Sequence, residues 1–359
     1  MPLPSIPEFS TCIKTPALVL PSVLKNGHPI EKGVRLIKYS GGFCVVFPYQ
    51  TINKKYAVRC WHAEVSDAKR RTQLISETLK KVNLPYFVGF EFYENGIMTP
   101  QGMQPIVVMD WVNAQSLKKF LAEHIKESNV INEVAENFKR MVADLHSNHL
   151  SHGDLQHGNI MIKPDRSLVL VDYDSMYVPD LKGMPDEIKG LVGYQHEGRW
   201  KNKEVSEKAD YFSELVIYIS LKALAKMPAL WNDLKMEDTE TLLFSGEDIQ
   251  SHGTSPIFHV LKTDSELAPW VDRLCDFMSK SSIEDLLPLE EAIISQSDSI
   301  AGKWRKGNGY VPTSGKGQIA DSKGISGKWA GGSGYVKPDP ADERNKISSS
   351  ISVKFKKPQ

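Results

Sequence analysis

The sequence of 359 residues has no net charge, few cysteines and no long apolar run. Its 44 Lys and Arg balance 44 Asp and Glu, so no global field favours nucleic acid or an anionic membrane surface. No stretch of about eighteen apolar residues is present, and the N-terminal MPLPSIPEFS lacks the basic and apolar regions of a secretory leader. We therefore expect a cytoplasmic protein, and we do not expect a membrane or nucleic acid as its partner.

The cysteines are scattered along the chain and form no CxxC pair. Such spacing argues against a disulfide framework and a structural zinc site, and it is typical of reduced thiols packed as small apolar residues. They are Cys12, Cys44, Cys60 and Cys275.

The chemically most informative segment is residues 145–174, LHSNHLSHGDLQHGNIMIKPDRSLVLVDYD. Asp154 opens a short loop that closes on Asn159, and Asp172 follows an apolar strand at residues 168–171. Two carboxylates and one amide can hold Mg²⁺ against phosphates and orient an acceptor hydroxyl, because magnesium prefers oxygen ligands and keeps several waters. The alternative is a solvated turn with a capping asparagine, since each of these residues is common in loops.

This arrangement resembles the catalytic core of the protein-kinase-like superfamily, in which H-R-D-x-x-x-x-N supplies a base and a metal ligand and D-F-G supplies the second metal ligand. The resemblance implies a bilobal α+β fold, with a small β-rich N-lobe and a larger helical C-lobe, and ATP and Mg²⁺ as cofactors. It implies that Asp154 is the base and that Asn159 and Asp172 are the metal ligands. It also implies that Asp210, the first residue of DYFSELVIYISLKAL, ties down the catalytic-loop backbone; an ordinary acid at a helix start is the alternative.

A turn near the N-terminus is the candidate phosphate-covering loop. Residues 34–49, VRLIKYSGGFCVVFPY, predict strand, turn and strand, with Gly41 and Gly42 at the turn. Glycine there would let backbone amides approach phosphates, but only Gly41 keeps the kinase pattern G-x-G-x-x-G. A plain β-hairpin therefore stays open as the alternative.

A third strand is predicted at residues 55–61, where Arg59 stands in place of the lysine of V-A-I-K. A guanidinium can bind phosphate oxygens bidentately, although it does not replace an ammonium at a tight site. In kinases a helical glutamate pairs with this position, and Glu77, on a helix predicted at residues 66–81, is the candidate, with Glu64 as a second choice. A surface arginine and a solvated glutamate are the alternatives. The helix is expected to bury Ala68, Thr72, Ile75 and Leu79.

Two further strands are predicted at residues 86–93 and 105–111, and the second leads into VNAQSLKKFL. This junction resembles the kinase hinge. The resemblance implies that Met109 is the gatekeeper and that backbone groups of Asp110 and Val112 bind the adenine edge. A strand end before a helix start is the alternative.

The acceptor is left open between three classes. Gly153 replaces the arginine of H-R-D and Gln156 replaces a loop lysine, which favours small-molecule phosphotransferases such as those of aminoglycosides and choline. Residues 176–200, ending in GYQHEGRW, resemble an activation segment, which favours a protein kinase. Arg59, Asp174 and the degenerate glycine loop favour a nucleotide-binding pseudokinase scaffold.

More of the chain matches one group. The segments LPYFVGFEF, HGDLQHGNI, VDYDSMYVPDLKG, GYQHEGR and YFSELVIYISLKALA, within about residues 33–230, resemble bacterial protein-kinase-like proteins with DYDGM in place of DFG. The resemblance implies a Ser/Thr protein kinase with phosphatase and von Willebrand factor A-type partners. Ser175 replaces the glycine of DYDGM, and Asp174 beside the metal would raise the metal demand or favour Mn²⁺.

Regulation by phosphorylation is not expected, because the loop lacks the arginine that would bind a phosphorylated activation segment. Replacing Ser175, Tyr177 or Tyr194 with a residue that cannot be phosphorylated is predicted to leave the rate near that of the wild type.

Three regions follow: an N-lobe with its extension at residues 1–112, a C-lobe at residues 113–298 and a tail at residues 299–359. The tail carries two copies of a G-K-W-x-x-G-x-G-Y-V unit, around Trp304 and Trp329, on a frame rich in glycine, serine and lysine. Two copies are too few for a solenoid. We expect a docking motif for a partner; packing on the lobes and stacking on single-stranded nucleic acid are the alternatives.

Overall fold

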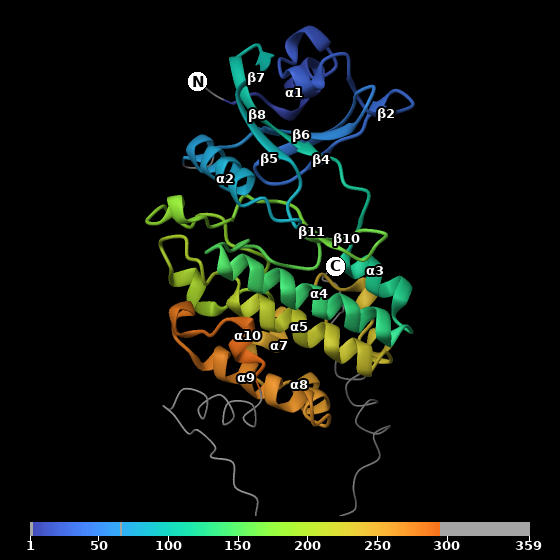
Figure 1. The fold of residues 1–359 in the computed structure, drawn as a ribbon, viewed down its shortest axis with the longest axis vertical. Coiled ribbons are helices and arrows are strands. Elements are labelled where there is room, and N and C mark those ends of the chain that lie inside the picture. The colour runs from blue at the N-terminus through green and yellow to red at the C-terminus, as the bar shows by residue number, and fades with distance from the viewer. Residues whose placement is uncertain (1–2, 65–66, 295–359) are drawn as a thin grey trace, which may run out of the picture. The chain divides into compact units, whose positions relative to one another are not determined.

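The computed structural model describes residues 3–64 and 67–294. Residues 1–292 form one compact unit, in which a β-rich lobe lies above a helical lobe (Figure 1). The predicted bilobal α+β fold is confirmed. The predicted tail, with its two repeats, lies outside the described residues.

The N-lobe is built on an antiparallel sheet with the order β1-β5-β6-β8-β7, and β4 pairs with the free side of β5 near its start. Phe47 of β5 lies opposite Val58 of β6, and both side chains are fully buried. β-Branched and aromatic residues suit such a half-buried pleated surface, which explains why these segments form strands. The strands are β1 (His28–Pro29), β4 (Tyr39–Ser40), β5 (Cys44–Gln50), β6 (Lys55–Trp61), β7 (Phe90–Thr99) and β8 (Gly102–Asp110), and β2 (Glu31–Lys32) pairs separately with β3 (Arg35–Leu36).

The predicted hairpin and third strand are confirmed by β4, β5 and β6, whereas the strand predicted at residues 86–93 begins too early. β7 starts at Phe90. The preceding residues pair with the other lobe, because Phe87 bridges Leu170 in parallel and Leu170 donates its N–H to the carbonyl of Tyr86 at 2.8 Å. Apolar side chains were needed there for contact with the C-lobe rather than for the sheet.

An N-terminal extension covers the sheet and was not foreseen as part of its core. Helix α1 (Ile6–Cys12) starts at a capping box formed by Ser5 and Glu8, which satisfies free N–H groups of the first turn. Phe9 and Ile13 are completely buried in the same cluster as Ile97 of β7. The extension is therefore an integral part of the N-lobe.

Helix α2 (Ala68–Val82) packs against β7 at the side of the sheet. Thr72, Ile75 and Leu79 are buried as predicted, and Ala68 is half-buried. Arg71 is buried as well, because its guanidinium donates to the carbonyl of Pro185 in the C-lobe. The helix therefore contacts both the sheet and the segment that follows the catalytic loop.

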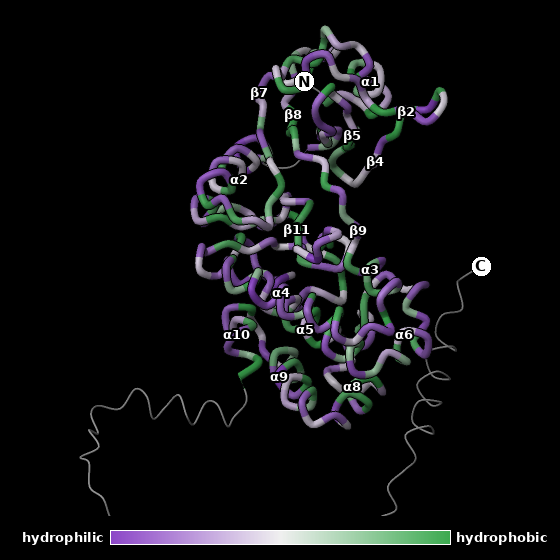
Figure 2. The backbone as a smooth tube through the Cα atoms, turned by 45° about the vertical axis from the view of Figure 1, so that its right-hand side comes forward, coloured by the Kyte–Doolittle hydropathy of each residue, from purple (hydrophilic) through white to green (hydrophobic). Residues whose placement is uncertain are grey.

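The C-lobe is organised around α5 (Tyr211–Lys226), which runs through the middle of the helical layer (Figures 1 and 2). Almost every residue of α5 is buried, and it packs on α4 (Ser128–Ser147) and α9 (Leu267–Ser279). A helix that is apolar all round needs such complete coverage. The remaining elements are β9 (Gln115–Ser116), α3 (Leu117–His124), β10 (Ile160–Ile162), β11 (Leu168–Leu170), α6 (Leu230–Asp233), α7 (Gly246–Gln250), α8 (Pro256–Leu261) and α10 (Leu289–Ala292).

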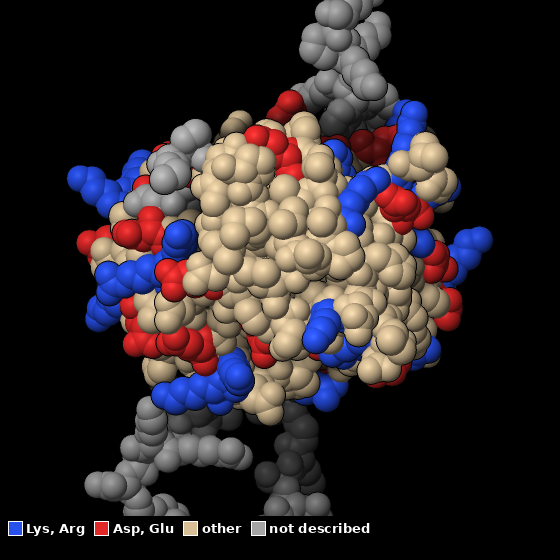
Figure 3. All heavy atoms as spheres, turned by 90° about the horizontal axis from the view of Figure 1, so that it is seen from above, with Lys and Arg blue, Asp and Glu red and all other residues tan. Residues whose placement is uncertain are grey.

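The surface of the described residues shows no strong preference for one sign of charge on the face seen from above, where an uncharged centre is surrounded by both acidic and basic side chains (Figure 3). Within residues 3–64 and 67–294, none of the helices combines the length and apolar character that crossing a membrane requires.

Candidate active site

The predicted catalytic loop, residues 152–159, is fixed by a buried carboxylate at the N-terminus of α5. Asp210 accepts the backbone N–H of His152 and that of Gly153, the latter at 3.0 Å to each oxygen. The predicted role of Asp210 in tying down this loop is confirmed. Gly153 has φ +76°, and a Cβ there would collide with the carbonyl oxygen of Ser175. The close approach excludes any larger residue, including the arginine of H-R-D, from this backbone.

Asp154 lies at the centre of the polar groups of this loop. Its Oδ2 accepts the side-chain Nδ2 of Asn159 at 3.0 Å, and its Oδ1 accepts the backbone N–H of Leu191 at 2.9 Å. Burial raises the pKa of Asp154 above its usual range, against the lowering effect of the bond from Leu191, and the charge of Asp172 raises it further. The carboxylate is thus oriented on both oxygens and is a stronger proton acceptor than an exposed one.

The β10–β11 hairpin brings Asn159 and Asp172 to the same end of two paired strands. The backbone carbonyl oxygen of Asn159 accepts a hydrogen bond from the backbone N–H of Val171 at 3.0 Å. The Asp172 side chain is 56 % exposed, and its backbone has φ +68°. An exposed carboxylate next to an amide suits magnesium, which in phosphoryl-transfer sites takes one or two side chains and completes its shell with phosphates and water. No group of three or more His, Cys, Asp and Glu that could enclose a metal occurs among the residues described.

Tyr173 anchors the residues on either side of it. Its hydroxyl donates to the carbonyl of Leu170 at 2.7 Å and accepts the N–H of Val88 at 3.0 Å. The ring packs edge-on against Phe87 and Phe90, and the residue is 1 % exposed. Asp172 and Asp174 therefore lie on either side of a residue whose position is fixed by hydrogen bonds and ring packing.

Arg59 is not a surface residue, because β6 lies between β5 and β8 and the side chain is 3 % exposed. Its Nη2 forms an ion pair with Oδ2 of Asp174 and lies 3.8 Å from Oδ1 of Asp172. Nε makes neither a hydrogen bond nor an ion pair with the described residues. A buried guanidinium with unused donors fits a phosphate ligand, because such donors are costly to leave unpaired.

The expected contact between Arg59 and Glu77 is not formed. Glu77 is exposed on α2 and accepts a hydrogen bond from Gln73 at 2.9 Å, as the turn of the helix places it on the solvent side. Glu64, the second choice, is exposed too. Sequence spacing alone could not identify Asp174 as the partner, because it lies far along the chain beside Asp172, the predicted metal ligand.

The glycine turn and the linker between the lobes leave specific backbone groups free. Gly41 donates its N–H to Cys44, and a Cβ on Gly41 or Gly42 would meet nothing within 4 Å, so both are open to solvent. At the linker, Asp110 donates its N–H to Gly89 at 2.9 Å, whereas the N–H of Val112 has no partner among the described residues. The carbonyl of Asp110 and the N–H of Val112 are thus the groups that remain for an adenine edge.

Met109, the predicted gatekeeper, lies in β8 between Ala57 of β6 and Phe90 of β7, and its side chain is half-buried. Neighbouring Lys55 places its ammonium 3.5 Å from the centre of the Trp111 ring, and burial lowers the pKa of Lys55. This contact fixes the first residue of the linker on the strand edge.

A buried ionic network joins the segment at residues 185–200 to the catalytic loop. The guanidinium of Arg199 contacts Asp186 through Nε at 3.1 Å, Gln195 through Nη1 at 2.6 Å and the carbonyl of Gly153. Lys189 adds a bond to Asp186 at 2.8 Å. Sequence reasoning missed this network, because residues 185–200 form no long helix or strand whose periodicity would bring Asp186, Lys189 and Arg199 together.

Tyr194 connects the same segment to the catalytic loop from the other side. Its hydroxyl lies 2.8 Å from Nδ1 of His157 and accepts the N–H of Leu242 at 2.9 Å. Burial lowers the pKa of His157 to about 4, and the charge of Lys118 lowers it further. His157 is therefore neutral at physiological pH, and its Nδ1 accepts a hydrogen bond from the hydroxyl of Tyr194.

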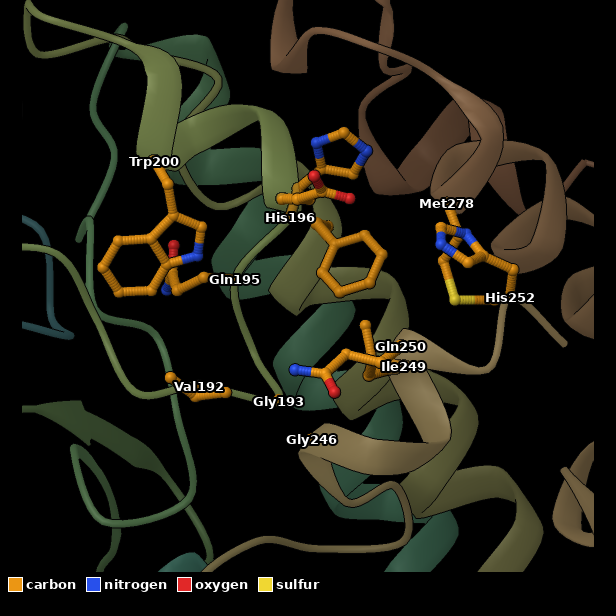
Figure 4. A pocket seen from close by; sticks show the side chains of 12 residues that line it. Val192, Gly193, Gln195, His196, Trp200, Gly246, Ile249, Gln250, His252 and Met278 are labelled. Carbon is orange, nitrogen blue, oxygen red and sulfur yellow. The ribbon is translucent and has the colours of Figure 1, made fainter.

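A pocket of about 350 Å³ is lined by residues that begin with Val192, the neighbour of Leu191 in the sequence (Figure 4). Two of its lining residues, Val192 and Trp200, are exposed apolar side chains of the segment that carries Arg199. The opposite wall comes from Ile249 and Gln250 of α7, and His252 and Met278 complete the far end. This pocket contains none of the predicted catalytic residues, but it begins one residue after the backbone donor to Asp154.

The comparison with protein families gives one match, to a model described as the protein kinase domain, over residues 40–284. The matched range includes the glycine turn, Arg59, the linker, the catalytic loop and the network of Arg199. The comparison with curated proteins gives no match.

Proposed function

The chain belongs to the protein kinase family, and we propose that it transfers the γ-phosphoryl group of ATP to serine and threonine hydroxyls of proteins in the presence of Mg²⁺. The observation that carries the proposal is the arrangement of Asp154, Asn159 and Asp172 at one end of the β10–β11 hairpin, with the buried donors of Arg59 near Asp172. Phosphoryl transfer depends mainly on positioning and charge stabilisation, which this set of groups can provide.

Each residue then has a distinct task. Asp154, oriented by Asn159 and Leu191, receives the proton of the acceptor hydroxyl or orients it. The amide oxygen of Asn159 and the carboxylate of Asp172 would hold Mg²⁺, and Arg59 would donate to phosphate oxygens. Bound ATP would supply the phosphoryl group, and bound Mg²⁺ would neutralise the negative charge that develops during its transfer.

Independence from activation-segment phosphorylation is part of the proposal. Asp186, whose side chain is 4 % exposed, already supplies a buried negative charge to Arg199 and Lys189, and Arg199 holds the catalytic loop. A phosphate commonly orders such a segment by adding a charge that arginine can bind. Here a permanent carboxylate occupies that role, so no modification is needed to order the segment.

A protein acceptor is favoured over a small molecule by the segment at residues 185–200. It is packed against the catalytic loop, and its exposed Val192 and Trp200 line the pocket next to Leu191, which suits an extended polypeptide better than an enclosed metabolite. The observation that favours a small-molecule acceptor is Gln156, whose Oε1 accepts the N–H of Gly158 at 2.7 Å and is thereby turned away from the lysine role.

The use of ATP and the unpaired cysteines among the described residues support a cytoplasmic site of action. We keep as proposals the phosphatase and von Willebrand factor A-type partners and the docking role of the tail repeats. Mn²⁺ is proposed as an alternative metal because Asp174 places a second carboxylate close to Asp172 in the sequence.

The experiment is intact-mass analysis of the purified protein after incubation with ATP and either Mg²⁺ or Mn²⁺. We expect a gain of whole phosphate units in the wild type and none in Asp154→Asn, which should still bind nucleotide. Transfer to an aminoglycoside or sugar alcohol without any protein phosphate would replace the proposal by the small-molecule reading. Nucleotide binding without transfer to any acceptor would indicate a pseudokinase scaffold.

A further inference from the structure

Arg59 has an acidic partner from an unexpected part of the fold. Its guanidinium is buried in the middle of the N-lobe sheet, and an isolated buried charge of this kind is strongly unfavourable. The carboxylate that compensates it belongs to Asp174, whose side chain is 20 % exposed. Asp172 is further away, at 3.8 Å, and more than half exposed.

Helix α2 offers no alternative partner. Glu77 is the single acid of α2, and it is exposed and bonded to Gln73. The inward side of the helix carries Thr72, Ile75 and Leu79, which bring no charge, and Arg71, which is directed to Pro185. The position of α2 therefore does not determine where the guanidinium of Arg59 lies.

We propose that Asp174 is the positioning residue for Arg59, so that the segment holding the metal ligand Asp172 also sets the phosphate-binding arginine. This rests on the proposed function, because it assigns Arg59 to the nucleotide phosphates. Tyr173 between the two acids is fixed by hydrogen bonds to Val88 and Leu170, so both carboxylates keep a defined direction. Three consecutive residues thus supply a metal ligand, an anchor and the partner of Arg59.

The ion pair also explains why arginine is compatible with this site. A guanidinium has five donors in a planar fork, so it can keep Asp174 on one side and still direct donors to a phosphate on another. Of the two nitrogens without a hydrogen bond among the described residues, Nη2 faces Asp174, which leaves Nε for a phosphate. A lysine ammonium at this place could not bridge both groups with the same geometry.

The competing role for Asp174 is that of a second metal ligand, and the two roles differ in what happens without metal. A positioning residue for Arg59 affects nucleotide binding even in EDTA, whereas a metal ligand acts only when metal is bound. The test therefore measures the affinity of a fluorescent ATP analogue for the full chain, first in EDTA and then with Mg²⁺.

Five variants are compared: Asp174→Asn, Asp174→Glu, Arg59→Gln, the double variant of Arg59→Gln with Asp174→Asn, and Glu77→Gln as the control. Asp174→Asn and Arg59→Gln are each expected to weaken binding in EDTA about tenfold, and the double variant no more than either alone, because coupled residues are not additive. Asp174→Glu keeps the carboxylate and should retain binding within about twofold, and Glu77→Gln should match the wild type.

Several results would overturn the inference. Asp174→Asn could bind the ATP analogue as tightly as the wild type in EDTA, or lose affinity only when Mg²⁺ is present. The losses of affinity could also add in the double variant, or Glu77→Gln could lose as much affinity as Asp174→Asn. If Asp174→Asn is too unstable for a binding measurement, its thermal stability is compared with that of the double variant instead of its nucleotide affinity in EDTA. The double variant leaves no uncompensated buried charge and must then be more stable than Asp174→Asn; equal instability would contradict the pairing. Since binding is read without turnover, a failure of phosphotransfer leaves this test unaffected.

Discussion

The backbone N–H of Leu191 donates to Oδ1 of Asp154 at 2.9 Å, so the segment after the proposed metal ligands directly contacts the proposed base. The contact uses the main chain rather than a side chain, and it depends on a close approach of the chain at Gly190. The orientation of Asp154 is therefore linked to the path of residues 185–200, which the network of Arg199 and Asp186 fixes.

Gly190→Ala is the direct test of that approach. A Cβ at this position would lie 2.5 Å from Oδ1 of Asp154 and would also crowd the amide of Gln195, so the backbone or the carboxylate must move. Displacement of a catalytic group by about 1 Å costs up to a hundredfold in rate, and we expect kcat to fall by about that amount with little change in nucleotide affinity. Steady-state kinetics check this. Leu191→Ala keeps the N–H and is the matched control, which should retain most of the activity.

Arg199→Lys should destabilise the protein and reduce its activity. A lysine cannot contact Asp186, Gln195 and the Gly153 carbonyl together, and loss of one partner from a buried ionic network costs roughly 3 to 5 kcal/mol. Urea unfolding measures the free energy of unfolding of the variant and of the wild type. Lys201→Met removes the exposed pair with Glu197 and should change it by less than about 1 kcal/mol. Equal effects of the two substitutions would contradict the role given to Arg199.

Tyr194→Phe refines the prediction that three hydroxyl residues can be replaced without effect. Ser175, Tyr177 and Tyr194 are all buried, so none presents its hydroxyl to another kinase in this structure. Tyr194→Phe leaves the buried N–H of Leu242 without its acceptor, which costs about 1 to 3 kcal/mol. Ser175→Ala and Tyr177→Phe should keep wild-type rates. Melting temperatures and rates separate the two effects; a stable but inactive Tyr177→Phe would contradict phosphorylation independence.

The buried cluster of His146, Glu214 and Glu290 predicts how the free energy of unfolding depends on pH. His146 lies 2.9 Å from Glu214 through Nε2 and 3.0 Å from Glu290 through Nδ1. Burial lowers the pKa of His146, but the hydrogen bonds and charges of the two glutamates prevail and raise it to about 9. Burial also raises the pKa of Glu214, to about 7. The folded state thus binds more protons than the unfolded chain, and the contribution of His146 is full below pH 6.5 and is lost as the pH rises through about 9.

His146→Gln should therefore destabilise the protein most at low pH, by on the order of 3 kcal/mol, the free energy that a rise of the His146 pKa from 6.5 to about 9 represents, and the difference in the free energy of unfolding from the wild type should narrow as the pH approaches 9. Urea unfolding from pH 6 to above pH 9 measures this trend. His149→Gln removes an exposed pair with Glu207 and should show no such dependence. A difference that stays constant over the range would show that the charge of His146 does not stabilise the fold.

The structure of the loop at residues 152–159 could be predicted because its information is local. Asp154, Asn159 and the β10–β11 hairpin lie within a short stretch, and Asp210 precedes a strongly apolar helix, so the motif and its spacing indicated how these residues lie together. The strand at residues 55–61 and most of the buried face of α2 were predicted for the same reason, since alternation and helical periodicity are short-range signals.

Contacts between distant segments could not be predicted in this way. The partner of Arg59 is decided by which carboxylate reaches the inner side of the sheet, and Glu77 and Asp174 look equivalent until the rotation of α2 is known. The early start assigned to β7 has a similar cause, because apolar residues that bind the other lobe resemble strand residues. The packing of α1 on the sheet likewise depends on tertiary contacts that no local pattern encodes.

The hydrogen bond from Val88 to the hydroxyl of Tyr173 bears on how the lobes move. Residues 86–88 precede a strand of the N-lobe, yet Tyr86 and Phe87 pair with Leu170 and Val88 binds Tyr173, so this stretch travels with the C-lobe. A rigid-body opening must then bend the chain at Gly89 and at the linker after Asp110, which are themselves joined by a hydrogen bond. Asp172, the proposed metal ligand, is the neighbour of Tyr173, so it would stay with residues 86–88 during such an opening.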